Sequence, residues 1–375
     1  VCAGVRIHTS LLDLKGMRSP IQLMFRWLSR NGKLSQQHLW RFIRRCSTVK
    51  LNSDDVNQNS SKDMIKRLES RGLPIVHHHG YVCDLPVNHH FPMKKFHGVM
   101  HHLKVDNVIS MRQVLEPERV NIKNAQTVHT VEYTEKFFNG HTSREEQKIT
   151  GFDWSEGLVS RVRYETGGTL LAAYAALERG VACSTGGGTH HAFPTHGSGY
   201  CLLNDLAIAA AVLLKEGVVQ KVLIVDLDVH QGDGTAYIFR NDPRVFTFSM
   251  HCEKNFPTRK QKSDLDVPLE DRMQDREYLD HLYTHLPRIL NDFCPDLVLY
   301  DAGVDPHVDD ELGRLSLTDK GLFDRDYYVI DTVVSKGCPI ATVIGGGYSR
   351  DIKTLSLRHT IVHRAATKVW TKKSI

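Results

Sequence analysis

The sequence lacks the cysteine pairs, the long apolar runs and the strong net charge that mark several specialised protein classes. Its eight cysteines are scattered, with no C-x-x-C pair, which indicates reduced thiols rather than a disulfide framework. No run of about 18 apolar residues occurs, so no transmembrane helix is predicted. The net charge is only +5 over 375 residues, and composition gives no argument for nucleic-acid binding.

Acidic residues are also missing from one long stretch near the start. None occurs between Asp13 and Asp54, where nine Lys or Arg are found. A basic, acid-free, amphipathic segment is typical of an organelle transit peptide, and the alternative is a basic extension without a targeting role. A polar stretch at 52–63 indicates a linker. We therefore expect residues 1–72 to be an extension with a linker, and residues 73–375 to form the folded domain.

From about residue 165 onward, short apolar runs alternate with longer amphipathic segments. This alternation predicts an α/β fold, with a central parallel sheet covered by helices on both faces. The expected strands are 181–183, 222–225, 245–248, 297–300 and 340–344. The expected helices are 170–179, 205–215, 276–293, 319–336 and 352–370.

Polar, glycine-rich clusters follow four of the expected strands. Ligands bind at the carboxyl ends of the strands in open parallel sheets, so we expect these clusters to converge on one site. They are STGGGTHH after Cys183, DLDVHQGDG after Val225, DAGVD after Tyr300 and GGGY after Ile344.

The second and third clusters contain a candidate metal site. Asp228 and His230 flank one residue, so in an extended segment both side chains point to the same side. Asp305, from another strand end, can supply a third ligand. Two carboxylates and one imidazole suit zinc or ferrous iron and leave positions open for water and substrate. An isolated D-x-H more often only caps a helix or bonds backbone, so the prediction depends on the matching loops.

The remaining clusters supply candidate catalytic groups. His190 and His191 can act as general base and acid if each is oriented by a carboxylate, for which Asp226 and Asp233 are candidates. Tyr348 can donate a hydrogen bond to an oxyanion. By contrast, the histidines at 77–79 lie in a strand-like apolar run, 75–85, and are expected to be structural.

In order and spacing, these motifs resemble the zinc-dependent histone deacetylases of the arginase-like fold, with the class IV branch and its bacterial relatives as the most similar subgroup. The resemblance covers about 73–370, and an early segment, HFPMKK at 90–95, looks like the family's substrate-side segment. The other matching segments are GGGTHH (186–191), GYCLLND (199–205), IVDLDVHQGDG (224–234), YDAGVDPHVDDELGRL (300–315) and GGGY (345–348).

The resemblance implies roles for individual residues. The metal ligands would be Asp228, His230 and Asp305, holding Zn²⁺, with Fe²⁺ as the alternative. The catalytic residues would be His190, His191, Tyr348, Asp226 and Asp233, with His191 as the usual proton acceptor. Gly199 would accept a hydrogen bond from the substrate lysine amide, and the acyl-lysine tunnel would be lined by Tyr200, Phe256 and Leu312. A structural K⁺ would be held near Asp226, Asp228, His230, Ser249 and Met250.

The implied activity is metal-dependent hydrolysis of the amide of acylated lysine in histones or other proteins, by a single deacetylase domain spanning 73–375. Two alternatives stay open, namely deacylation of polyamines or other small amides, and an inactive scaffold protein. Tyr200 stands where many relatives have Phe, and no counterpart of the class I rim aspartate is found. The family's usual location is the nucleus and cytoplasm, whereas the basic extension favours a mitochondrion or plastid.

Overall fold

The computed structural model describes residues 72–375, which contain an eight-stranded sheet with parallel pairing throughout. The extension predicted at 1–72 lies almost wholly outside the described residues. In spatial order the strands are β2 (Val114–Leu115), β1 (Ile75–Val76), β3 (Val181–Ser184), β8 (Ile340–Val343), β7 (Leu297–Asp301), β4 (Val222–Asp226), β5 (Val245–Cys252) and β6 (Leu265–Leu269).

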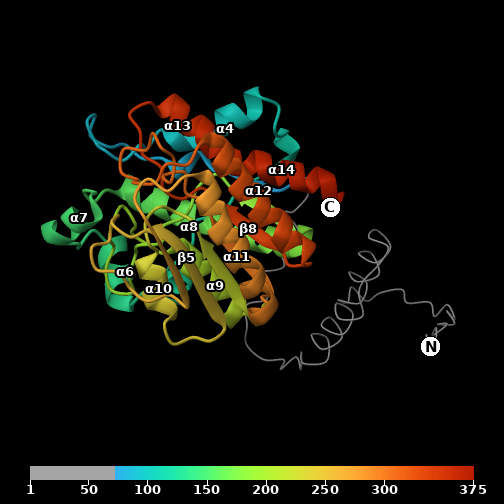
Figure 1. Cartoon of the computed structure of the whole chain (residues 1–375). Coiled ribbons are helices and arrows are strands. Elements are labelled where there is room, and N and C mark those ends of the chain that lie inside the picture. The colour runs from blue at the N-terminus through green and yellow to red at the C-terminus, as the bar shows by residue number, and fades with distance from the viewer. Residues whose placement is uncertain (1–71) are drawn as a thin grey trace, which may run out of the picture. The chain divides into compact units, whose positions relative to one another are not determined.

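Helices flank this sheet, as the α/β pattern predicts (Figure 1). Helix α8 packs against α9, whereas α12 packs against both α11 and α14. Among the described residues no helix is both long and apolar enough to span a bilayer. The helices are α4 (Lys95–Val105), α5 (Ile122–Ala125), α6 (Val131–Phe138), α7 (Arg144–Thr150), α8 (Glu156–Arg179), α9 (Asp205–Lys215), α10 (Asp233–Phe239), α11 (Asp275–Phe293), α12 (Asp319–Ser335), α13 (Ile352–His359) and α14 (Ile361–Lys373), with short 3₁₀ turns at His79–Tyr81 and Met111–Gln113.

The five expected strands are confirmed, and the helix expected at 205–215 has those bounds. The helix expected at 352–370 is instead two helices, α13 and α14. They meet at Thr360, whose N–H and hydroxyl both donate to the carbonyl of Leu357. A hydrogen bond to the third residue back forms a tight 3₁₀-type turn, which ends the first helix. The strand-like run at 75–85 keeps only two residues as strand, because a 3₁₀ turn begins at His79.

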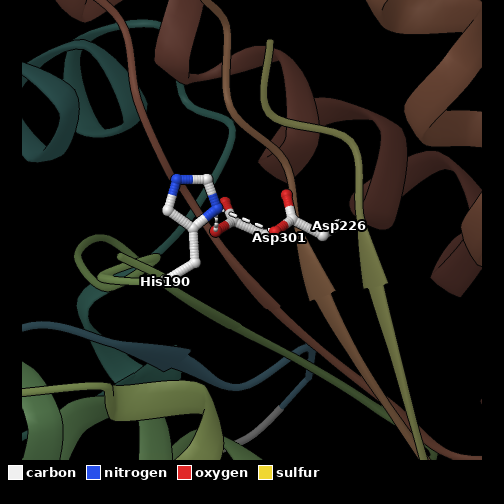
Figure 2. Close-up of side chains that lie close together, drawn as sticks. All are labelled: His190, Asp226 and Asp301. Atoms are coloured by element: carbon white, nitrogen blue, oxygen red, sulfur yellow. Dashed lines mark hydrogen bonds and ion pairs between the residues drawn. The ribbon is translucent and has the colours of Figure 1, made fainter. Parts of the chain in front are cut away.

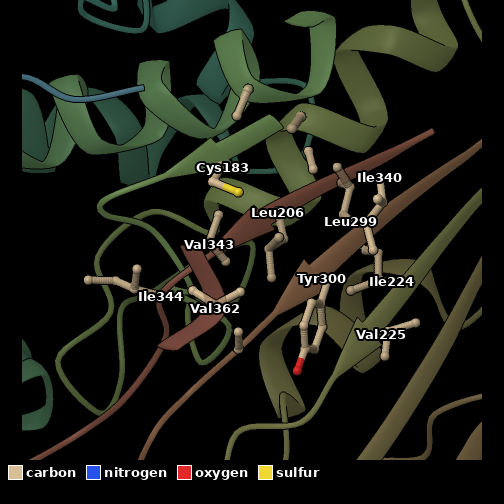
Figure 3. Packing of buried hydrophobic residues seen from close by; sticks show 14 of the residues in the cluster. Cys183, Leu206, Ile224, Val225, Leu299, Tyr300, Ile340, Val343, Ile344 and Val362 are labelled. Atoms are coloured by element: carbon tan, nitrogen blue, oxygen red, sulfur yellow. The ribbon is translucent and has the colours of Figure 1, made fainter. Parts of the chain in front are cut away.

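The central strands are buried on both faces, which explains their uninterrupted apolar sequences. All five residues of β4 and all five of β7 are buried. Figure 3 shows side chains of β4, β7 and β8, including Val225, Leu299 and Ile340, within this core. The sheet therefore forms a rigid base for the loops at its carboxyl edge.

Arg325 of α12 connects the helical layer to two of those loops. Its side chain is fully buried, and its Nη1 donates to the carbonyl oxygens of Leu227 (3.1 Å) and Gly303 (2.8 Å), which follow β4 and β7. Its Nε donates to Asp326 at 2.8 Å, and Asp326 also accepts from the hydroxyl of Tyr300 at 2.6 Å. One buried cation thus holds the two loops that carry the candidate metal ligands.

We expect Arg325→Met to lower the free energy of unfolding by about 3–5 kcal/mol, because it leaves the Asp326 carboxylate buried without its partner. Urea denaturation followed by circular dichroism measures the change. The matched control is Arg244→Met, which breaks an ion pair with Asp242 at an arginine that is 58% exposed. That change should cost less than about 1 kcal/mol. Equal, small effects of both substitutions would contradict the role of Arg325.

Candidate active site

The structure brings together the three predicted metal ligands from two neighbouring loops. Asp228 and His230 follow β4, and Asp305 follows β7; these strands pair in parallel. The Nδ1 atom of His230 lies 3.0 Å from a carboxylate oxygen of Asp228 and 3.2 Å from Oδ2 of Asp305. All three side chains are buried, and their ligand atoms lie within 4.8 Å of one another.

This donor set fits a divalent metal such as zinc or ferrous iron. Oδ2 of Asp305 is buried and accepts no hydrogen bond in the structure, so one lone pair is available to a cation. Burial and the neighbouring Asp228 carboxylate raise the pKa of Asp305 to about 7, which shows how strongly the site favours added positive charge. Gly346 follows β8 and must lack a side chain, because a Cβ there would lie 2.2 Å from Oδ2 of Asp305.

Each histidine of the GGGTHH segment bonds the carboxylate predicted for it. Nδ1 of His190 lies 2.7 Å from Asp226, and Nδ1 of His191 lies 2.6 Å from Asp233. Burial lowers the pKa of His191 to about 4, helped by the charge of His190, so His191 is neutral near pH 7. Burial acts in the same direction on His190, but Asp226 and Asp228 outweigh it and hold its pKa well above the usual value.

Asp301 is a site residue that the sequence analysis missed. It pairs in register with Asp226 across β7 and β4, and its Oδ2 lies 3.8 Å from Nδ1 of His190 (Figure 2). Both of its carboxylate oxygens are buried without a hydrogen-bond partner. Burial and the Asp226 charge hold the pKa of Asp301 well above its usual value. The signal was present, since a charged residue ends a wholly apolar strand.

Tyr348 is held at the cavity by its backbone. Its N–H donates to Oδ2 of Asp310 at 2.7 Å, and the ammonium of Lys95 donates to the carbonyls of Gly345 (3.2 Å) and Gly347 (3.4 Å). Burial and the charge of Asp228 raise the pKa of the Tyr348 phenol well above its usual value. The phenol therefore remains protonated and can donate a hydrogen bond. Neither Lys95 nor Asp310 was singled out from the sequence.

The four predicted substrate-binding residues are distributed between the cavity and its surroundings. Gly199 and Tyr200 line the cavity, whereas the side chains of Phe256 and Leu312 are 44% and 45% exposed. A Cβ at Gly199 would lie 2.8 Å from His191 and 3.0 Å from Phe256, so only glycine fits between them. Phe256 itself contacts His191 edge to face, with ring centroids 4.9 Å apart.

Two of the predicted potassium ligands lie on β5, which pairs with β4 on the side opposite β7. Asp226 pairs in register with Ser249 of β5, and Met250 follows Ser249 on the same strand. The Ser249 hydroxyl lies 2.9 Å from Nδ1 of His251. With Asp228 and His230 in the loop after β4, the set is contiguous, and its binding of K⁺ stays a prediction.

The cavity continues past the candidate catalytic residues to an end that sequence reasoning did not predict. It has about 410 Å³ of empty space, part of it open to solvent, and its lining includes the fully buried side chains of Lys95, Arg161 and Glu165. Lys95 begins α4, and the other two lie one turn apart in the apolar helix α8. The histidines at 77–79 do not line this cavity; His77 bonds Thr185 at 2.7 Å, and His78 stacks on Tyr164.

Comparison with known proteins identifies the family. The model of the histone deacetylase domain matches residues 89–363. The chain belongs to the histone deacetylase family. The matched region includes the site just described, because it spans every residue predicted to be catalytic or to bind the metal.

Relatives agree with this assignment. An uncharacterized protein of Picosynechococcus sp. is 50% identical over 299 residues, which are 80% of this chain and 100% of that protein. Histone deacetylase 2 of Arabidopsis thaliana is 28% identical and aligned over 70% of each chain. The acetoin utilization protein AcuC of Staphylococcus aureus is 31% identical, aligned over 60% of this chain and 63% of its own. The crystal structure of the HDA15 HD domain has the same fold, with a TM-score of 0.67 at 22% identity, covering 79% of this chain and 88% of that one.

We expect Asp305→Asn to weaken Zn²⁺ binding by more than about 100-fold, because removing a direct ligand exceeds the 10–100-fold effect of an outer partner. Zinc content after dialysis against a weak chelator measures the loss. His191→Ala is the control, since its Nδ1 bonds Asp233 and it belongs to no ligand group; it should keep about one zinc per chain. Full zinc retention by Asp305→Asn would rule out this ligand set.

Proposed function

We propose that the protein hydrolyses the side-chain amide of acylated lysine in histones or other proteins, releasing free lysine and acetate or another carboxylate. Family membership supports deacetylase-type hydrolysis in general. The observation that carries the finer proposal is the cavity itself, which joins the candidate metal ligand Asp228, both histidines and Tyr348 in one narrow space. A long, unbranched side chain suits such an opening better than a bulky amide does.

A divalent metal held by Asp228, His230 and Asp305 would act as a Lewis acid toward the reacting water and amide carbonyl. The protein's own groups supply the proton transfers. Because Nδ1 of His191 bonds the Asp233 carboxylate, the proton of the neutral ring resides there and Nε2 is free to accept one from water. His190 keeps its proton beside Asp226, and the histidine pair can then protonate the departing lysine amine.

Tyr348 provides the remaining stabilisation. Its protonated hydroxyl can donate to the oxygen that becomes negatively charged when the carbonyl is attacked. The hydrogen bond to Asp310 fixes the Tyr348 backbone, so the donor is in place before the reaction. Preorganised donors of this kind cost no rearrangement in the transition state.

The zinc-loaded full chain should release lysine from an acetyl-lysine peptide. Mass spectrometry of the peptide, with fluorimetric detection of free amine, measures this turnover. Acetylated polyamines form the second arm of the experiment, because the same tunnel admits an alkyl amide without a peptide. Turnover of polyamines alone would overturn the protein-lysine proposal, and turnover of neither would favour a non-catalytic role.

Tyr348→Phe should lower the turnover number by about 10²–10³, because it removes one donor aimed at developing charge. The Michaelis constant should change much less, since the interaction strengthens mainly in the transition state. Zinc content and melting temperature should stay near wild type, because the hydroxyl is not a metal ligand. Tyr164→Phe, which removes a hydroxyl from a residue outside the cavity lining, is the matched control. An unchanged rate in Tyr348→Phe would make Tyr348 a packing residue.

A further inference from the structure

The buried end of the cavity contains polar groups that the proposed hydrolysis does not use. Lys95, Arg161 and Glu165 are only 2%, 1% and 2% exposed. They line the same cavity as Gly199, Tyr200 and Tyr348, which are half-exposed and so mark the side open to solvent. A lysine side chain that enters past Tyr200 and presents its amide at Tyr348 would therefore direct its acyl group toward these buried charges.

Glu165 has one oxygen with no partner. Its Oε1 accepts from Arg161 (2.8 Å) and from the N–H of Gly187 (3.4 Å), but Oε2 is buried and accepts no hydrogen bond. Arg161 makes two further contacts, because its Nε donates to the carbonyl of Tyr81 and its guanidinium lies over the ring of Phe96. A buried acceptor without a donor is unfavourable, so Oε2 is able to accept a hydrogen bond from a ligand.

The ammonium group of Lys95 has one hydrogen-bond donor without a partner among the described residues. An ammonium has three N–H donors, and Lys95 makes two hydrogen bonds, both long, to the carbonyls of Gly345 and Gly347. Its third donor has no acceptor among the described residues. The lining of one cavity thus offers one free donor and one free acceptor, which are the two partners that a hydroxyl group uses.

We propose that the buried end of this cavity recognises a short acyl group that carries a hydroxyl, with the hydroxyl oxygen accepting from Lys95 and its proton donated to Glu165. This inference rests on the proposed hydrolysis of acyl-lysine. The favoured substrates are lysines bearing short hydroxyacyl groups of three or four carbons, and the products are lysine and a hydroxycarboxylate.

Other acyl classes fit this end less well. The cavity must also hold the methylenes of the substrate lysine, so a long acyl chain would compete with them for space. A long alkyl chain would press apolar surface against three ionisable groups. An acyl group with a second carboxylate would place a like charge beside Glu165.

The test compares one peptide sequence carrying different acyl groups. Two matched pairs differ only by a hydroxyl, propionyl against 2-hydroxypropionyl and butyryl against 3-hydroxybutyryl, and octanoyl and succinyl complete the set. We expect kcat/KM to rise about tenfold with the hydroxyl in at least one pair, the effect of one hydrogen bond to a charged group. Octanoyl and succinyl should be the slowest substrates.

The outcomes separate this inference from the proposed function. Turnover of acetyl-lysine with no gain from the hydroxyl in either pair overturns only the inference, as does octanoyl or succinyl exceeding both hydroxyacyl substrates. No turnover of any acyl-lysine peptide overturns both.

Variants of Glu165 test whether this residue recognises the hydroxyl of the acyl group. In Glu165→Gln an amide replaces the free carboxylate oxygen, and the ratio of kcat/KM for the hydroxylated and unsubstituted members should fall toward one. Using the ratio cancels any general loss of activity. Glu146→Gln, which weakens a half-buried pair with Lys136 outside this cavity, should leave the ratio unchanged. If Glu165→Gln does not fold, Glu165→Asp keeps the charge but withdraws it by one methylene, and the ratio should fall likewise. An unchanged ratio in the folded variant overturns the role of Glu165.

Discussion

Four carboxylates lie buried where β4 and β7 end, and the positions of the surrounding loops depend on compensating their charge. Asp226 and Asp301 face each other in register, while Asp228 and Asp305 follow within a few residues. Like charges so placed repel strongly in a low-dielectric interior. Backbone N–H groups, the histidines and a bound cation can each offset part of this repulsion. Arg325 of α12 donates hydrogen bonds to the carbonyls of both loops. Its buried positive charge therefore links the helical layer to the loops that carry the candidate metal ligands.

The parts of the fold that sequence could predict are those buried on both faces. The strands β3, β4, β5, β7 and β8 are apolar runs between helices, and their positions were confirmed. The edge strand β6 contains Pro268, which interrupts a strand pattern. Strands β1 and β2 have two residues each, too few to show a periodicity, and the predictions did not reach the short helices between 95 and 150.

The residues of the candidate site likewise differ in how well the sequence predicts them. Residues directly after a strand, such as Asp228 and Tyr348, were predictable because parallel strands bring their carboxyl ends to one edge. Glu165 was not, and Lys95 was included only as part of the segment 90–95, because each lies on a helix where a charged residue ordinarily faces solvent. Only the tertiary packing turns them inward. The groups proposed for bond cleavage thus come from loops, and those proposed for acyl selection come from helices, so substitutions could change one without the other.

The order of strands has a further consequence. The four loops that meet at the site follow β3, β8, β7 and β4, which are consecutive neighbours in the sheet. Their mutual positions are therefore set by one continuous ladder of backbone hydrogen bonds, with no hinge between them. An enzyme built this way has no need to close two lobes around its substrate. Its reacting groups are held in place before any ligand arrives, and exposed side chains beside them, such as Phe256, have room to move as substrates enter and leave.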